Sequence, residues 1–255
     1  YQHHYTTLYD GFQFSVDEFF ENQRAAGKRL HYTVRLHVEL KDKVLAEVGC
    51  AAGGILHYLR PFCARVAGCD YGTAFLRKGL AEGLNLKTGG LATLREERPD
   101  AILYSHVLEH VYDLGAELRQ VHDMLPERGL LIVDVPGVFN IENAYQADYL
   151  RYLQNAHLFQ FTAATLTTLM ARHGFRAIHV DERCIAVFEK AAPGSLPVAF
   201  DEALAGRILA FLHRIEGKVL LYRLRALPRR IAVGALKALG LHDAVRSLYR
   251  RLFRK

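Results

Sequence analysis

Short apolar runs alternate with amphipathic segments along most of this chain. The apolar runs predict strands at residues 44–48, 65–70, 84–87, 101–105, 130–135, 177–180 and 185–190. Apolar residues at helical spacing predict helices at residues 16–23, 30–40, 54–60, 73–83, 115–124 and 163–173. Strands that alternate with helices predict an α/β fold, in which a mostly parallel sheet is covered on both faces. Ligands of such sheets bind beyond the carboxyl ends of the strands.

The turn after the first predicted strand is rich in small residues. Residues 44–54 read VLAEVGCAAGG, and the next predicted strand ends on Asp70. Small residues let the backbone approach a ligand closely and adopt conformations that larger side chains resist. A carboxylate at the end of the following strand can accept hydrogen bonds from both hydroxyls of a ribose. This order of strand, turn, helix, strand and acid predicts a site for an adenosine-containing cofactor.

Two cofactor classes fit this turn. Gly49, Ala51 and Gly54 fit a loosened dinucleotide fingerprint, whose turn binds a pyrophosphate at a helix N-terminus. A second interpretation starts from Glu47. Together with Gly49, Ala51 and Gly53, it resembles the E/D-x-G-x-G-x-G first motif of class I S-adenosylmethionine (SAM) methyltransferases, with Ala51 in place of the middle glycine. The acid favours SAM, because a carboxylate attracts a sulfonium and an amino group but repels a pyrophosphate.

Two downstream segments resemble the same family. Residues 105–111 read SHVLEHV, which is similar to the fourth-strand motif of methyltransferases of the ubiquinone-biosynthesis type. Residues 157–162 read HLFQFT and resemble the passage that borders the acceptor pocket in those enzymes. The resemblance runs in order through residues 44–190 and extends to methyltransferases of polysaccharide gene clusters. It implies a Rossmann-like class I methyltransferase sheet, mostly parallel with one antiparallel strand, and SAM as the cofactor.

The resemblance also implies roles for individual residues. Asp70 is expected to bind the ribose, Tyr71 to contact the adenine, and Glu47 to lie near the methionine end of SAM. Further cofactor-side positions are Gly49, Ala51, Gly53, Leu91, Ser105 and His110. The alternative to ribose binding is that Asp70 is simply a solvated acid at the end of a strand. The alternative for Glu47 is that it organises the turn and does not contact SAM.

Histidines supply the candidate proton acceptors. An alcohol is a poor nucleophile while protonated, so a base with a pKa near neutral assists its attack on the methyl group. We expect His157 to be this base and His106 to be a second catalytic candidate. The alternative is that these histidines shape the site through hydrogen bonds only. No group of His, Asp and Glu has convincing metal-ligand spacing in the sequence, so no metal site is expected.

The segment 139–155 is the candidate acceptor side. Tyrosines at 145, 149 and 152 have the spacing of one helical face, which predicts a single helix packed as a lid. Tyr145, Tyr149 and Arg151 combine aromatic faces with hydrogen-bonding groups and suit a polar ring such as a sugar. We therefore expect O-methylation of a sugar hydroxyl in bacterial polysaccharide or glycolipid synthesis. A quinone or other natural product is the alternative acceptor, and a non-catalytic SAM-fold scaffold is the alternative class.

Charge divides the chain unevenly. Residues 1–200 carry 20 Lys and Arg against 23 Asp and Glu, whereas residues 201–255 carry 13 against 4. We expect an N-terminal helical cap at 1–43, the methyltransferase core at 44–190 and a basic helical extension at 191–255. The extension can pack on its own domain, lie on an anionic membrane or bind phosphates. Because no RNA-binding module is recognisable, nucleic acid is not expected as a partner.

Composition favours a cytoplasmic protein. The chain has 255 residues, 51% of them hydrophobic, which is enough for one full α/β core. It shows no run of about 18 apolar residues, so no membrane-spanning helix is expected. Four cysteines without a C-x-x-C pair predict reduced thiols packed in the core. Location at the inner face of a membrane is possible through the basic extension alone.

Overall fold

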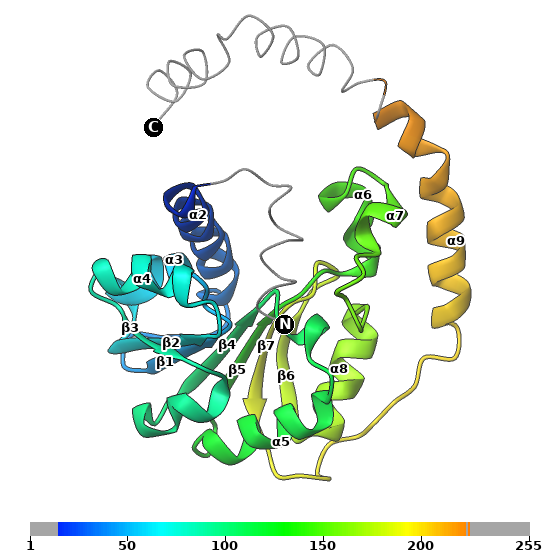
Figure 1. Ribbon diagram of the computed structural model, residues 1–255. Coiled ribbons are helices and arrows are strands. Elements are labelled where there is room, and N and C mark those ends of the chain that lie inside the picture. The colour runs from blue at the N-terminus through cyan, green and yellow to red at the C-terminus, as the bar shows by residue number, and fades with distance from the viewer. Residues whose placement is uncertain (1–14, 223, 225–255) are drawn as a thin grey trace, which may run out of the picture. The chain divides into compact units, whose positions relative to one another are not determined.

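The computed structural model describes residues 15–222 and 224 (Figure 1). These residues form two compact units, and each unit is described by itself. The first contains residues up to 140 and residues 154–202, and the second contains residues 141–153 and those from 203 onward. The part of the predicted basic extension from residue 225 onward lies outside the described residues.

A seven-stranded sheet forms the centre of the first unit (Figure 1). Its strands are β1 (Val44–Val48), β2 (Arg65–Asp70), β3 (Asn85–Thr88), β4 (Ala101–Ser105), β5 (Leu130–Asp134), β6 (Phe175–Val180) and β7 (Ile185–Lys190). The spatial order is β3-β2-β1-β4-β5-β7-β6, and β7 alone runs antiparallel to its neighbours. The predicted α/β class with one antiparallel strand is confirmed. Strand order reverses between β1 and β4, and this reversal is where such sheets bind ligands.

Helices cover both faces of the sheet (Figure 1). The longer ones are α2 (Val16–Val34), α3 (Gly54–Leu59), α4 (Thr73–Ala81), α5 (Leu114–Met124) and α8 (Ala163–Arg172), and 3-10 turns occur at η1 (Arg60–Phe62), η2 (Leu91–Glu97), η3 (Leu108–His110) and η4 (Val138–Asn140). One buried cluster joins the sheet to α2, α3 and α4, and a second joins it to η2, α5 and α8. Because both faces are covered, the central strands read as continuous apolar runs.

The N-terminal helix differs from its prediction. Two helices were expected at 16–23 and 30–40, but α2 is one helix that begins at a Ser15–Glu18 capping box and ends at Val34. The intervening residues, RAAGKR, carry no apolar stripe, yet most of them are good helix formers. Gly27 also permits close packing there, since a Cβ would lie 3.1 Å from the Ile55 Cα. Packing against α3 therefore extends the helix across a segment without an apolar pattern.

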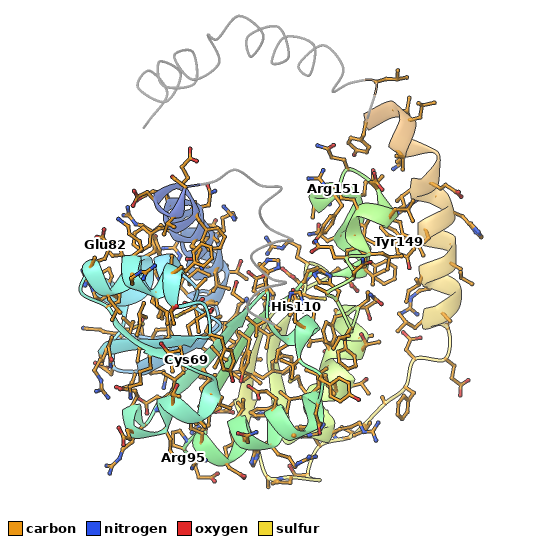
Figure 2. The ribbon with its side chains drawn as sticks, viewed as in Figure 1. Cys69, Glu82, Arg95, His110, Tyr149 and Arg151 are labelled. Atoms are coloured by element: carbon orange, nitrogen blue, oxygen red, sulfur yellow. The ribbon has the colours of Figure 1, made fainter. Side chains whose placement is uncertain are left out.

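The cysteines behave as predicted, as free thiols. All four lie in described residues and are unpaired, and Cys50, Cys69 and Cys184 are buried. Figure 2 shows Cys69 within the sheet layer. Burial raises the pKa of the Cys63 thiol to about 11 and that of Cys69 to about 12. They remain protonated at neutral pH and serve as small packing groups.

Among the described residues, the second unit includes the helices α6 (Ile141–Ala144), α7 (Tyr149–Tyr152) and α9 (Leu204–Glu216). The single helix predicted across the tyrosines is wrong, because Gln146 and Ala147 adopt left-handed φ values of 56° and 63°. The three rings nevertheless cluster. The Tyr152 ring centroid lies 5.3 Å from that of Tyr145 and 6.2 Å from that of Tyr149.

The helix α9 lies in the segment predicted as a basic helical extension, and one of its sides is apolar and buried. Phe211 and Ile215 are buried, while Leu209 is 57% exposed. Beyond the helix, Lys218 Nζ forms a 2.7 Å ion pair with Glu142 Oε1, which ties this segment to α6. Among the described residues, no helix has the length and apolar content needed to cross a bilayer.

Candidate functional site

The turn between β1 and α3 has an unusual backbone. Gly49, Ala51 and Gly53 all have left-handed φ values, of 71°, 46° and 77°. The Gly49 and Cys50 N–H groups donate to the Cys69 carbonyl at 2.8 and 3.0 Å, so the turn is fastened to β2. A side chain at position 53 would be both strained and crowded, because a Cβ would lie 2.7 Å from Leu84 Cδ1. The predicted close-approach turn is present at the carboxyl end of β1.

Asp70 organises this turn. Its Oδ2 accepts a 2.8 Å hydrogen bond from the Ala51 N–H, and its Oδ1 accepts a 2.6 Å bond from the Gly72 N–H. The acid is thus a structural hydrogen-bond acceptor and not simply a solvated strand end. Each carboxylate oxygen has a second lone pair, so the same group can also accept the hydroxyls of a ribose.

Glu47 is a buried acid in the middle of this region. It is 1% exposed, and among the described residues its Oε2 has no hydrogen-bond partner. Desolvation raises the pKa of Glu47 well above its usual value, and the charge of Asp70 raises it further. A buried carboxyl oxygen without a partner costs free energy unless a cation or a hydrogen-bond donor meets it. The ammonium group of SAM has the chemistry to satisfy it, so the residues present fit this cofactor.

Gln23 of α2 braces the turn from the other side. Its amide nitrogen donates to the Cys50 carbonyl at 3.1 Å, and its Oε1 accepts from the Gly54 N–H at 3.2 Å. Gly54 permits this approach, because a Cβ there would collide with the Phe20 carbonyl oxygen. Sequence reasoning missed Gln23. It lies about thirty residues before the motif, and no local pattern links the two.

Two residues were assigned to the adenine side. Tyr71 is 58% exposed, and its hydroxyl lies close to Gly90 in the loop after β3. A Cβ built on Gly90 would lie only 2.7 Å from the Tyr71 hydroxyl oxygen. Leu91 is 3% exposed and belongs to the core beneath η2. Tyr71 therefore offers a ring to a ligand, whereas Leu91 can offer only its backbone.

The end of β4 carries the first candidate catalytic histidine. The Ser105 hydroxyl donates to Asp134 Oδ2 at 3.3 Å, and the His106 N–H donates to the Asp134 carbonyl at 2.8 Å. His106 has a left-handed φ of 56°, and its Nδ1 lies 3.5 Å from Glu109 Oε1. Desolvation lowers the pKa of His106, but the interaction with Glu109 and the charge of Asp134 outweigh it, so the pKa is raised overall.

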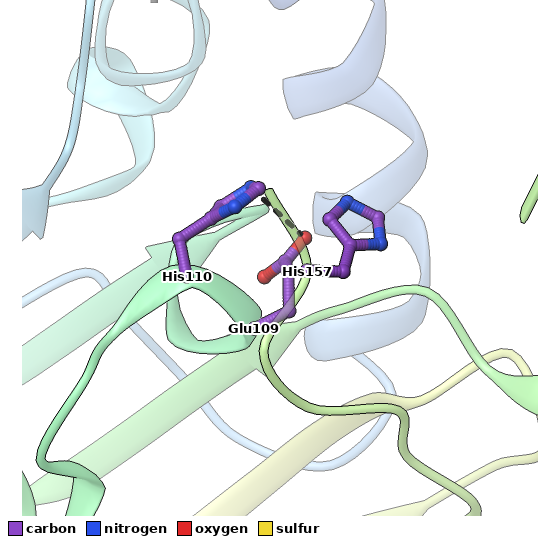
Figure 3. A group of neighbouring side chains, drawn as sticks. All are labelled: Glu109, His110 and His157. Carbon is purple, nitrogen blue, oxygen red and sulfur yellow. Dashed lines mark ion pairs between the residues drawn. The ribbon is translucent and has the colours of Figure 1, made fainter. Parts of the chain in front are cut away.

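The passage around His157 meets the SHVLEHV segment. The Leu158 N–H donates to the Glu109 carbonyl at 2.8 Å, and His110 Nδ1 lies 2.8 Å from the Ala156 carbonyl oxygen. These bonds bring the His110 and His157 rings to a centroid distance of 4.9 Å around the Glu109 carboxylate (Figure 3). Desolvation lowers the pKa of His157; the charge of Glu109 opposes this shift, but the neighbouring histidines also lower the pKa, so it is lowered overall. The structure thus gathers His106, His110 and His157, and it adds Glu109, which was not predicted as a site residue.

The predicted acceptor residues lie in the second unit. Tyr149 and Arg151 both project from the short helix α7 (Figure 2), and Tyr149 is 38% exposed. Asp148 caps this helix by accepting the Arg151 N–H at 3.1 Å. Tyr145, Tyr149 and Arg151 therefore form a local group by themselves, and their role toward an acceptor stays a prediction.

Comparison with known proteins agrees with this geometry. The model of a methyltransferase domain family matches residues 19–180. A SAM-dependent methyltransferase of Thermotoga maritima, described as a possible histamine N-methyltransferase, has 15% identity and a TM-score of 0.53, and the match covers 72% of this chain and 98% of that one. A SAM-dependent methyltransferase of Archaeoglobus fulgidus has 16% identity and a TM-score of 0.50, covering 68% and 74%. At these identities the structures show a shared fold alone. A search of curated proteins finds no match.

The family match covers well over half of the chain, including the turn, Asp70 and the SHVLEHV segment. The dinucleotide interpretation of the turn is therefore set aside. The chain belongs to the methyltransferase domain family, as an α/β SAM-dependent methyltransferase in which Asp70 and Gln23 hold the turn between β1 and α3.

Proposed function

We propose that the protein methylates a hydroxyl group of a small molecule or glycan, and that a sugar hydroxyl of bacterial polysaccharide or glycolipid synthesis is the acceptor. The observation that carries this proposal is the imidazole and carboxylate group at the end of β4, formed by His106, Glu109, His110 and His157. An amine acceptor needs only to arrive uncharged. A hydroxyl must lose a proton as it attacks, and this group can assist that loss.

The residues divide into a cofactor side and an acceptor side. Bound SAM supplies an electrophilic methyl group on a sulfonium. Asp70, Tyr71 and Glu47 hold the cofactor, and in-line alignment of the acceptor oxygen with the methyl group provides much of the acceleration. The lowered pKa of His157 keeps its ring neutral near pH 7, so that it can accept the hydroxyl proton. His106 is the second candidate for this role.

The tyrosine group of the second unit supports a sugar as acceptor. The rings of Tyr145 and Tyr149 both pack on the buried Tyr152 ring, and Arg151 adds a guanidinium with five hydrogen-bond donors. Aromatic faces pack against the apolar faces of a sugar ring, while charged donors bind its hydroxyls. The aromatic and guanidinium side chains of the second unit therefore support a glycan as the acceptor.

A surface hollow favours the alternative acceptor, a quinone or another aromatic natural product. It has a volume of about 720 Å³, and one of its lining residues, Phe159, follows His157 by two positions in the sequence. Its lining is largely apolar and includes Tyr112, Leu114, Phe159, Phe161 and Leu169. An aromatic ring that carries a hydroxyl would bury apolar area there.

Methyl transfer from isotopically labelled SAM tests both acceptors. The full chain is incubated with a panel of nucleotide- and lipid-linked saccharides and, in parallel, with catechols and quinols. Labelled methyl ether on a saccharide supports the proposal, and label on the aromatic panel alone selects the alternative. SAM binding without transfer to any acceptor of either panel favours a binding or scaffold role.

We also propose a peripheral contact with an anionic membrane at the cytoplasmic side. Residues 201–255 carry a net charge of +9 from 13 basic and 4 acidic residues. Leu209, Leu220 and Leu221 are 54–64% exposed in the described part of this segment. Vesicle flotation tests the contact: the protein should float with anionic vesicles, and salt should release it. Flotation that is equal with neutral vesicles would contradict it.

A further inference from the structure

The carboxylate of Glu109 is buried without a hydrogen bond. The residue is 1% exposed, and neither Oε1 nor Oε2 has a hydrogen-bond partner among the described residues. Burying a carboxylate in this way costs several kcal/mol unless a cation compensates it. Buried charges in proteins are accordingly paired or coordinate metals.

Imidazole nitrogens surround this carboxylate. Glu109 Oε1 lies 3.8 Å from His110 Nε2 and 3.5 Å from His106 Nδ1, both longer than ordinary hydrogen bonds. Three possible ligand atoms, one each from Glu109, His110 and His157, lie within 4.8 Å of one another (Figure 3). A tetrahedral ion with bonds of about 2.0–2.1 Å needs separations of roughly 3.3 Å. The ligand atoms would therefore have to move closer together on binding an ion, and the partly buried His157 is the ligand whose side chain we expect to move.

The tautomer of His110 follows from its other nitrogen. Nδ1 lies 2.8 Å from the Ala156 carbonyl oxygen, which can only accept, so Nδ1 carries the proton. In the neutral ring, Nε2 then presents a lone pair toward the Glu109 carboxylate. A cation placed between these two electron-pair donors would satisfy both of them and compensate the charge of the carboxylate. A histidine that ligates a metal typically donates its second N–H to a carbonyl in this way.

We propose that Glu109, His110 and His157 bind a divalent cation of the zinc or manganese class. Two imidazoles and one carboxylate suit a first-row transition ion better than Mg²⁺ or Ca²⁺, which prefer oxygen ligands. Three protein ligands leave at least one position for an exogenous oxygen. Sequence spacing did not suggest this site, because His157 lies 47 residues after His110 and is brought in by the backbone bond to Glu109.

For its chemical role, the site rests on the proposed O-methylation. A hydroxyl bound to the ion has a lowered pKa and loses its proton to water. A lone pair of that oxygen then forms the bond to the methyl carbon while the carbon–sulfur bond breaks. The electron pair of the broken bond stays on sulfur, giving a methyl ether and neutral S-adenosylhomocysteine. In this arrangement His157 is a ligand of the ion and does not accept the proton itself.

Calorimetric titration of the untagged, chelator-treated full chain with Zn²⁺ and with Mn²⁺ tests the site. We expect one equivalent to bind, and Glu109→Gln and His157→Ala to weaken that binding at least 10-fold. His173→Ala is the matched control, since this partly exposed histidine lies at the end of α8, outside the group. Equal binding by all variants would place the ion at surface histidines and overturn the proposal.

A SAM titration of the same samples separates the possible failures. Variants that still bind SAM are folded, so their loss of metal is local. A wild-type chain that binds SAM but neither ion overturns the site and leaves the contact with His106 to compensate the buried Glu109 carboxylate. A chain that binds the ion but methylates no hydroxyl supports the site and contradicts the proposed function instead.

Discussion

Asp70→Asn separates the two tasks that the structure gives to Asp70. The carboxylate accepts backbone bonds from Ala51 and Gly72, at 2.8 and 2.6 Å, and has lone pairs left for a ribose. Asparagine keeps one acceptor oxygen and turns a donor toward one of these N–H groups. A hydrogen bond to a charged group contributes about 1.5–3 kcal/mol. Because Asp70 is partly exposed, the lower end of that range applies to the free energy of unfolding.

We expect Asp70→Asn to lower the free energy of unfolding by about 1.5 kcal/mol in urea denaturation followed by circular dichroism. The SAM dissociation constant from calorimetry should rise about 10- to 150-fold, the equivalent of about 1.5–3 kcal/mol. Asp100→Asn is the matched control, because Asp100 Oδ2 accepts the Val44 N–H at 2.8 Å at the opposite end of the sheet. Wild-type SAM affinity in Asp70→Asn, or an equal loss in Asp100→Asn, would refute this reasoning.

Three further perturbations test other parts of the site. Burial raises the pKa of Glu47, so the wild type loses stability as pH rises from the unfolded pKa through the folded one. In urea denaturation, the stability gain of Glu47→Gln over the wild type should therefore be larger at pH 8 than at pH 5, and the variant should bind SAM more weakly. A stability difference that does not change with pH would contradict this. Gly54→Ala should cost about 1–3 kcal/mol through its collision with the Phe20 carbonyl and weaken SAM binding. Its control, Gly206→Ala, should be neutral or stabilising in the same unfolding assay, because among the described residues no atom lies within 4 Å of a Cβ built there. His157→Ala should lower turnover about 10²–10⁴-fold at unchanged SAM affinity, and a variant that retains most of its turnover would exclude His157 from the reaction.

The centre of the sheet was predictable because the central strands are buried on both faces. The first two strands and the fourth match the expected residues 44–48, 65–70 and 101–105, since continuous apolar runs bounded by turn residues define them sharply. Helices without a full apolar stripe were less predictable. The helix α2 crosses residues 24–29 because it packs on α3, and that contact has no local pattern in the sequence.

The candidate site was predictable where one short segment defines it. The turn from Gly49 to Gly53 and the acid Asp70 follow from local composition and spacing. The parts that depend on distant contacts were not predictable. Gln23 reaches the turn from α2, and the bond from Leu158 to the Glu109 carbonyl brings His157 beside a buried acid.

Calorimetric titration of the wild-type chain with SAM tests the central claim most directly. We infer that the left-handed turn, the buried Glu47 carboxyl and the Asp70 carboxylate form a site for one SAM molecule. The account predicts saturable binding with a stoichiometry of one, competed by S-adenosylhomocysteine. A folded chain that shows no saturable binding of SAM would contradict it.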